Sequence, residues 1–452
     1  MRKALLSAAA LSVFATFAAA DDAAMQAQID ALNKKVQTLE KQQQRSNKML
    51  SKVNAQSAND NIKWSVDFRT AYDNLDYKLE GGGSVSNPSL FTNRLWLGMG
   101  AAPTDDLTFI GQIALYSTWG GNNLPANDPF QNVNWRASSK PDDIIFKLRQ
   151  AYFIYTLDRS AAFPVSFSAG RRAATDGFLA NHREFTKNPG SPLAHITNME
   201  VDAGMVKIDN VFVLPGSYLK LVAGRSYTNI NQPSYSGTPY TAVNTQDTDV
   251  NFFAAPMSLY NDGQTDLMAQ YTVIFGFMGT DGSGQPVTGA GMKHMGALSL
   301  QIDGLNDESD FWDGSTFFAS AAFTTSDPKS GYMMLGTDKT ETGYSFWTGL
   351  IVPDMITGGR IGFEYNYGSK YWAPMTWAED TLAGSKIATR GNAYETYWNL
   401  PIVKDNLTAQ IRYTYMDYDY KSNVEEFWAD PTLQPGDPKS AQDLRIFVRY
   451  TY

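Results

Sequence analysis

The sequence predicts an all-β fold: a transmembrane antiparallel β-barrel of about 16 strands, preceded by a short periplasmic coiled-coil helix. Three observations lead to this fold class. Apolar and polar residues alternate in many segments after residue 61, short and long connections alternate between those segments, and a heptad pattern occupies residues 25–53. After the first twenty residues, no stretch approaches the ~18 apolar residues that a membrane helix needs.

Residues 1–20 have the pattern of a secretory signal peptide. Arg2 and Lys3 are followed by an apolar, alanine-rich run, and Ala18 and Ala20 provide the small residues that signal peptidase accepts before Asp21. The alternative is a membrane anchor, but the run is short for a membrane helix. We therefore expect export with cleavage.

Residues 21–53 are predicted to form a coiled-coil helix. Apolar residues recur at alternating spacings of four and three, which places them in one stripe, whereas an amphipathic helix lying on its own domain would need no such strict register. The seam residues are Met25, Ile29, Leu32, Val36, Leu39, Leu50 and Val53. In model coiled coils, Ile or Val at one seam position and Leu at the other favours an assembly of two chains. Residues 54–61 contain no large apolar side chain and are predicted to be a linker.

Residues 62–452 are predicted to form the barrel, because the hydrophobic period changes there from 3.5 to 2. Ile62, Trp64, Val66 and Phe68 alternate with polar residues, as strands between lipid and a wet lumen require. The chain ends on an aromatic residue with apolar residues at every second position before it, which resembles the signal that the barrel-assembly machinery reads. These residues are Leu444, Ile446, Val448, Tyr450 and Tyr452.

The connections between the strands alternate in length, as they do in outer-membrane barrels with short periplasmic turns and long external loops. The tight connections are predicted at 103–106, 158–162, 214–217, 261–264, 305–310, 353–358 and 404–406. The longer ones are predicted near 73–90, 119–143, 172–199, 229–246, 279–291, 324–342, 369–390 and 420–441. Pro256 makes 247–260 the weakest predicted strand.

A barrel of this size is too wide for side chains to fill. The 172–199 connection carries many charges of both signs and is predicted to narrow the pore, the alternative being an ordinary exposed loop. Strand parity and this loop give the pore-lining or constriction candidates Lys63, Asp67, Arg69, Lys147, Arg149, Arg171, Arg172, Arg183, Glu184, Glu364, Arg412, Arg445 and Arg449. Cations predominate, so we expect a mild preference for anions.

Composition argues against most other functions. The chain has no cysteine, three histidines and a net charge of −9. It therefore offers no thiolate metal site or attached haem and no basic surface for nucleic acid. No nucleophile motif contains any of the three histidines, His182, His195 and His294. The pair His182 and Glu184 offers too few ligands, at too weak a spacing, for a metal site. We expect no enzymatic activity, no catalytic residue, no metal and no cofactor.

Three segments resemble a known family. They are 53–78, 90–115 and 170–202, and the run Gly170–Arg171–Arg172 is the most specific part. The chain resembles the porin-like outer-membrane proteins of campylobacter-type bacteria that are catalogued as a family of unknown function. The resemblance implies a signal peptide, a short heptad helix and a barrel, and analogy with general porins implies a homotrimer. Ala173 stands where the family would lead us to expect proline.

These patterns together predict a bacterial outer-membrane porin for passive or weakly selective diffusion of small hydrophilic solutes. The expected partners are outer-membrane lipid, the barrel-assembly machinery, two further copies of the chain and the cell wall. The alternative is a structural envelope tether or surface adhesin built on a barrel, with the helix as the part that contacts the cell wall.

Overall fold

The computed structural model describes residues 62–119, 146–174, 176–186, 189–228, 249–376, 381–404, 406–421 and 429–452. The chain divides into two units, residues 1–62 and residues 63–452. The predicted signal peptide, coiled coil and linker lie outside the described residues. In the described residues, no helix is long and apolar enough to cross a membrane.

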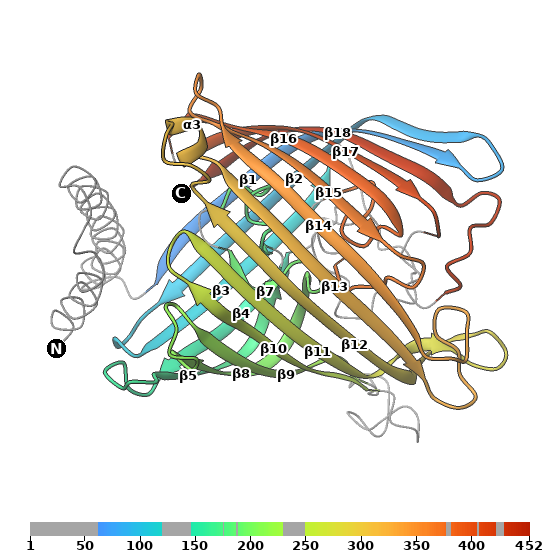
Figure 1. Ribbon diagram of the computed structural model, residues 1–452, viewed down its shortest axis with the longest axis horizontal. Helices are drawn as coiled ribbons and strands as arrows, with labels where there is room; N and C mark the ends of the chain where they lie inside the picture. Colours follow the sequence, from blue (N-terminus) through green and yellow to red (C-terminus); the bar gives the residue numbers. More distant parts are fainter. Residues whose placement is uncertain are drawn as a thin grey trace, which may run out of the picture. The chain divides into compact units, whose positions relative to one another are not determined.

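The second unit is a closed barrel of sixteen strands, each antiparallel to its neighbours (Figure 1). The barrel strands are β1 (Lys63–Leu79), β2 (Ser84–Ala101), β3 (Leu107–Thr118), β4 (Lys147–Thr156), β5 (Val165–Ala174), β8 (Met199–Asp209), β9 (Tyr218–Tyr227), β10 (Val250–Asn261), β11 (Thr265–Thr280), β12 (Pro286–Asp303), β13 (Thr316–Pro328), β14 (Glu341–Pro353), β15 (Arg360–Gly368), β16 (Gly391–Val403), β17 (Leu407–Tyr418) and β18 (Pro438–Thr451). The predicted all-β class and strand number are confirmed.

Each strand pairs with the next barrel strand along the chain, and β1 pairs with β18 to close the ring. At this seam the main-chain amides of Val66 and Tyr452 each donate to the other residue's carbonyl, at 3.0 and 2.9 Å. Closure leaves no open sheet edge, so the strands can satisfy their backbone polar groups without water.

Alternate side chains face the lumen and the outside, as the period of two predicts. In β1, Arg69 and Asp73 are buried in the lumen. Phe68 points to the opposite face of the same strand and is exposed. In β18, Leu444, Ile446, Val448 and Tyr450 face outward and are 37–42% exposed. The outward surface is therefore apolar and the inward surface is largely polar.

Most short connections lie at one end of the barrel, the turn end, and the longest ones lie at the other, the loop end. Helix α3 (Asp310–Asp313), capped by the Ser309 side chain, lies in one of the turns, at the same end of the barrel as the C-terminus (Figure 1). The predicted alternation of short and long connections holds for most of the barrel, with two exceptions at the loop end.

The lengths of two connections were predicted wrongly. Residues 73–90 do not form a long loop, because β1 and β2 continue to Leu79 and from Ser84 and only a short turn joins them. Gly81, Gly82 and Gly83 all have positive φ there, which glycine adopts without strain. Between β11 and β12, the connection near 279–291 likewise shrinks to residues 281–285.

The weakest predicted strand is present as β10. Pro256 pairs in register with Gln270 of β11, but the register with β9 passes from Ala254 directly to Met257. Proline has no amide hydrogen to donate, so the ladder is interrupted on that side.

Candidate functional site

The loop between β5 and β8 enters the lumen. It contains a small parallel sheet of β6 (Gly177–Phe178) and β7 (Gly190–Leu193). The amide of Leu193 donates to the Gln270 side chain of β11 at 2.8 Å, and His195 lies between inward-facing serines of β13 and β14. The prediction that this segment is an inserted loop rather than an ordinary exposed one is thus consistent with the contacts of its described residues.

The loop reaches the far side of the ring from the strands that carry it. The Asn399 side chain of β16 donates to the carbonyl of His182 at 3.2 Å, and that of Gln410 in β17 donates to the carbonyl of Arg183 at 2.6 Å. Arg449 of β18 donates to the carbonyl of Glu184 at 2.8 Å. Because β5 and β8 lie across the barrel from β16 and β17, the loop crosses the lumen.

His195 fixes the loop to the wall. Its Nδ1 lies 2.7 Å from the Ser320 hydroxyl and its Nε2 lies 2.8 Å from the Ser345 hydroxyl. The ring is completely buried between Trp347 and Trp372. Burial lowers the pKa of His195 to about 3, because the charged imidazolium would lose its hydration. The neutral ring donates one hydrogen bond and accepts another.

A second loop, described at residues 369–376 and 381–390, also folds inward and joins the first. Thr197 and Met375 form a parallel β-bridge. The amide of Asn198 donates to the carbonyl of Met375 at 2.7 Å, and the amide of Met375 donates to the carbonyl of Ile196 at 3.1 Å. The sequence predicted 369–390 only as an external loop, so its luminal position was missed.

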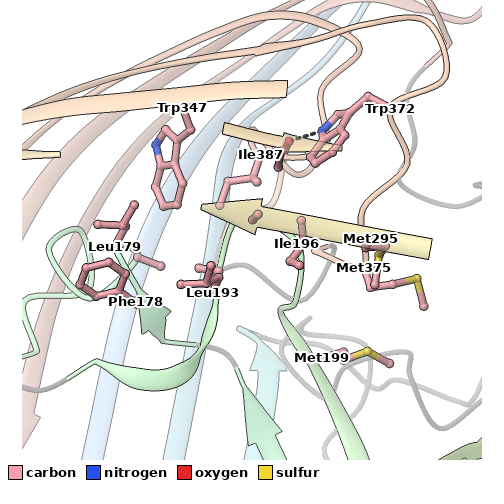
Figure 2. Close-up of a cluster of buried hydrophobic side chains, with 14 of the residues drawn as sticks. Phe178, Leu179, Leu193, Ile196, Met199, Met295, Trp347, Trp372, Met375 and Ile387 are labelled. Carbon is pink, nitrogen blue, oxygen red and sulfur yellow. Dashed lines mark hydrogen bonds between the residues drawn. The ribbon is translucent and has the colours of Figure 1, made fainter. Parts of the chain in front are cut away.

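The two loops share an apolar core with the wall from β8 to β16. Figure 2 shows Phe178, Leu193 and Ile196 facing Trp347 and Trp372, which come from β14 and the second loop. The Trp372 indole also donates to the carbonyl of Ile387 at 2.8 Å. This core, which excludes water, holds both loops against one part of the wall.

Charged side chains gather where both loops meet β15, β16 and β17. Lys386 of the second loop lies 2.6 Å from the Glu364 carboxylate and also bonds Glu395. Arg183 of the first loop lies 3.0 Å from Glu184 and 3.7 Å from Glu395. Arg412 of β17 lies 3.9 Å from Glu395. Buried ions need such mutual compensation, so this network ties the loops to one geometry.

The adjoining arc, from β18 through β1 to β4, carries an arginine-rich wall. Asp67 bonds Arg94 at 3.1 Å and also bonds Arg449. The guanidinium of Arg149 lies 4.0 Å above the Trp96 ring. These side chains face inward from neighbouring strands, so they can present charge to a solute in the lumen.

The structure places most predicted pore-lining residues on inward positions or in the inserted loop. Arg69, Arg149, Arg183, Glu184, Glu364, Arg412 and Arg445 are all buried within the barrel. Lys63 and Lys147 are the first residues of β1 and β4. Arg171 differs, because it pairs in register with Asp202, which is exposed, and lies 3.3 Å from its carboxylate. Whether any of them lines a conducting path stays a prediction.

Sequence reasoning missed several residues that complete the network, above all Lys386 and Glu395. Glu395 lies on an inward position of β16, so strand parity could have identified it. Lys386 could not be identified in this way, because side chains in a loop do not alternate between two faces as they do in a strand. The apolar residues Trp372 and Met375 in a supposedly external loop were the available sign that it folds inward.

A cavity of about 1110 Å³ opens beneath the first loop at the turn end. Its lining includes His182, Phe185, Asp266, Arg360 and Arg449, together with turn residues such as Gly263 and Gly358. Burial lowers the pKa of His182, so its ring stays neutral at neutral pH. Among the described residues, no group of three or more metal-ligating side chains comes together.

Comparison with solved structures identifies the same architecture. The high-pH structure of Pseudomonas putida OprB matches with a TM-score of 0.50 and 13% identity, over 88% of this chain and 96% of that one. An anion-selective porin from Comamonas acidovorans matches with a TM-score of 0.46 and 11% identity, over 86% of this chain and 100% of that one. At such identities the likeness to OprB shows a shared fold, and the second match carries no further weight.

Residues 84–444 match the model of a family described as a protein of unknown function, DUF3373. No curated protein matches the chain. The match covers most of the barrel, and the predicted membership of a porin-like family of unknown function is confirmed at this level, while the campylobacter-type source stays a prediction. The chain belongs to the DUF3373 family.

Proposed function

We propose that the protein is an outer-membrane porin-type channel for passive or weakly selective diffusion of small hydrophilic solutes. The observation that carries the proposal is a loop that crosses the lumen of a sixteen-stranded barrel and meets charged side chains on the far wall. Charged groups at a constriction set ion preference by their sign and spacing. The shared fold with OprB supports the architecture that this function needs.

The proposed preference is for anions. Arginine and lysine outnumber aspartate and glutamate among the predicted pore-lining residues, and the arginine-rich wall adds Arg94 to them. The net negative charge of the whole chain does not oppose this, because exposed loop charges are screened within about 8 Å at physiological salt.

Planar-bilayer recordings of the refolded mature protein test the proposal. In a potassium chloride gradient, the reversal potential should indicate mild chloride preference. Arg183→Gln removes a cation from the inserted loop and should shift the potential toward potassium, whereas Arg159→Gln removes an exposed cation in a turn and should leave it unchanged. No conductance, or strong potassium preference in the unchanged protein, would count against the channel or its selectivity, respectively.

The proposed assembly is a homotrimer in the outer membrane, with residues 1–20 removed, residues 21–53 in a periplasmic coiled coil and residues 54–61 as linker. The outward apolar surface supports contact with outer-membrane lipid, and the terminal residues Leu444 to Tyr452 support recognition by the barrel-assembly machinery. Cell fractionation followed by cross-linking should recover a trimer from the outer membrane.

Catalysis is the least favoured function. His195 contacts two serine hydroxyls, but its ring is fully buried, and its recorded partners among the described residues include no carboxylate. A serine hydrolase needs an accessible serine and an oriented, basic histidine. The tether or adhesin role remains compatible with a channel, since it depends on residues 21–53 and on surface loops rather than on the lumen.

A further inference from the structure

We propose that the inner wall of β5, β8 and β9 holds a binding site for small oxyanions with two or more negative charges. The site is the wall cation cluster, defined by Arg172, Lys207 and Lys220. It lies apart from the loop-borne charges described above, and β5, β8 and β9 are adjacent in the barrel (Figure 1). How an oxyanion reaches it rests on the proposed channel function, but binding itself does not.

The three cations face the lumen. Tyr218 and Val222, which flank Lys220 at two-residue spacing in β9, pack against the luminal apolar core, whereas Leu221 is exposed on the outside. Arg172 of β5 bonds the hydroxyl of Ser168, which is buried. Each side chain therefore projects inward from its strand.

The cluster concentrates like charges. Lys207 and Lys220 are directly paired across β8 and β9. Both ammonium groups lie against the same Tyr218 ring, at 4.9 and 5.0 Å from its centroid. Lys220 also lies within electrostatic range of Arg172. Like charges at directly opposed positions of a sheet destabilise the pair, so this arrangement has a cost unless an anion compensates for it.

The chain supplies too few acceptors for these donors. Asp209 lies 2.7 Å from Lys207 and neutralises one of the three charges. Within the described residues, Lys220 contacts the Tyr218 ring and forms no hydrogen bond or ion pair with a carboxylate, although Asp209 lies within electrostatic range of it. The Nε of Arg172 is buried and likewise has no acceptor among the described residues, although the guanidinium stacks 4.6 Å from the Tyr152 ring.

These features specify the ligand class. A buried donor without an acceptor costs about 1–3 kcal/mol, and an oxyanion entering the cluster would satisfy it. Three cations and one carboxylate, Asp209, leave the cluster with a net charge of +2, which favours a divalent ligand over chloride because the attraction grows with ligand charge. Dicarboxylates and phosphate share the required chemistry: several acceptor oxygens and a charge near −2.

Two measurements on the folded mature protein test the site. In bilayers, succinate or inorganic phosphate added to potassium chloride should reduce chloride current saturably. In detergent solution, isothermal titration calorimetry should detect binding of the same two probes. Lys220→Gln should raise the half-blocking concentration and the Kd about tenfold, which corresponds to ~1.4 kcal/mol. Probing both anions shows whether carboxylate or phosphate is preferred.

Arg225→Gln is the matched control. Arg225 belongs to the same strand, but its side chain is exposed and lies 2.6 Å from Asp249. It should leave block and binding within twofold of the unchanged protein. Heat-modifiable migration on gels verifies that each variant folds. If Lys220→Gln does not fold, Lys207→Gln is tested in its place.

The outcomes separate this site from the channel function. A conducting protein with neither saturable block nor measurable binding, or with binding that Lys220→Gln leaves unchanged, overturns the site but not the channel. If the protein does not conduct but binds the anions, and Lys220→Gln weakens that binding, the result supports the site and refutes the channel.

Discussion

His195 illustrates how one side chain can decide the position of a loop. It joins the loop between β5 and β8 to two strands through both ring nitrogens, in a setting from which water is excluded. The recorded contacts of the ring are hydroxyls and indoles, so no neighbouring carboxylate among the described residues compensates a proton on it. The neutral ring is therefore required for the observed packing.

This requirement predicts that acid weakens the loop. The pKa of His195 in the folded loop, about 3, lies below its ordinary value of 6.5. Between these two pH values, His195 is therefore protonated when the loop is released and neutral when the loop is packed. The stabilisation is fully present above pH 6.5 and decreases by about 1.4 kcal/mol per unit as the pH falls towards 3. The protection of the amides of residues 189–198 against hydrogen exchange, relative to their intrinsic rates, should accordingly decrease between pH 7 and pH 4.

His195→Gln provides the control, because glutamine has hydrogen-bonding groups but does not titrate. The variant should exchange faster than the unchanged protein at pH 7, since glutamine fits the site less well, and its exchange should respond less to acid after correction for intrinsic rates. An equal acid response in both proteins would assign the effect to other groups.

At the scale of elements, the two inserted loops depend on each other. Lys386 of the second loop connects Glu364 and Glu395, and Glu395 also pairs with Arg183 of the first loop. Arg183 further donates to the Thr381 hydroxyl of the second loop at 3.2 Å. Release of one loop therefore leaves buried charges of the other less compensated.

Lys386→Met should consequently loosen both loops. Removing one member of a buried ion pair costs roughly 3–5 kcal/mol, because the remaining charge stays in a poor environment. We expect protease cleavage in both loops, including 176–186, and a higher or noisier single-channel conductance. Lys370→Met, in the same loop but against Tyr371, should behave like the unchanged protein. Cleavage confined to the second loop would contradict the coupling.

The last strand also yields a prediction. The Tyr452 backbone closes the seam with Val66, whereas its side chain is exposed. Tyr452→Ser keeps the backbone bonds and removes the aromatic ring. If the assembly machinery reads that ring, the variant should accumulate less folded barrel in cells yet refold normally in detergent. Equal loss in both settings would instead indicate an intrinsic contribution to stability.

The sequence predicted the strands well and the lumen only in part. A period of two is local information, and it assigned Arg69, Arg445 and Leu444 to their correct faces. The continuation of β1 to Leu79 and the start of β2 at Ser84 were missed, because polar residues between 73 and 90 suggested a loop. The pairing of Thr197 with Met375 could not be predicted, because it depends on two loops meeting across a closed barrel, which no local pattern encodes.

At the scale of the whole molecule, the barrel divides into an arc filled by the two loops and an arc lined with arginine. The main apolar core occupies the side from β8 to β16, so we expect a solute path to follow the arginine-rich wall from β18 through β1 to β4. The wall cation cluster on β5, β8 and β9 lies beside the end of that wall, where the apolar core begins. The proposed anion preference thus follows from which part of the lumen the loops leave unfilled.

Deletion of residues 21–61 tests how far the barrel acts alone. Its strands close the ring among themselves, with β1 bonded to β18, so the barrel should fold and conduct without the deleted segment. Conductance per barrel should stay within about twofold, because no inward-facing strand residue is lost. If residues 21–53 join three chains or contact the cell wall, cross-linked trimers and retention with the wall fraction should both decrease. Loss of conductance with intact folding would mean that the deleted segment contributes to the pore itself, and would refute the division of labour proposed here.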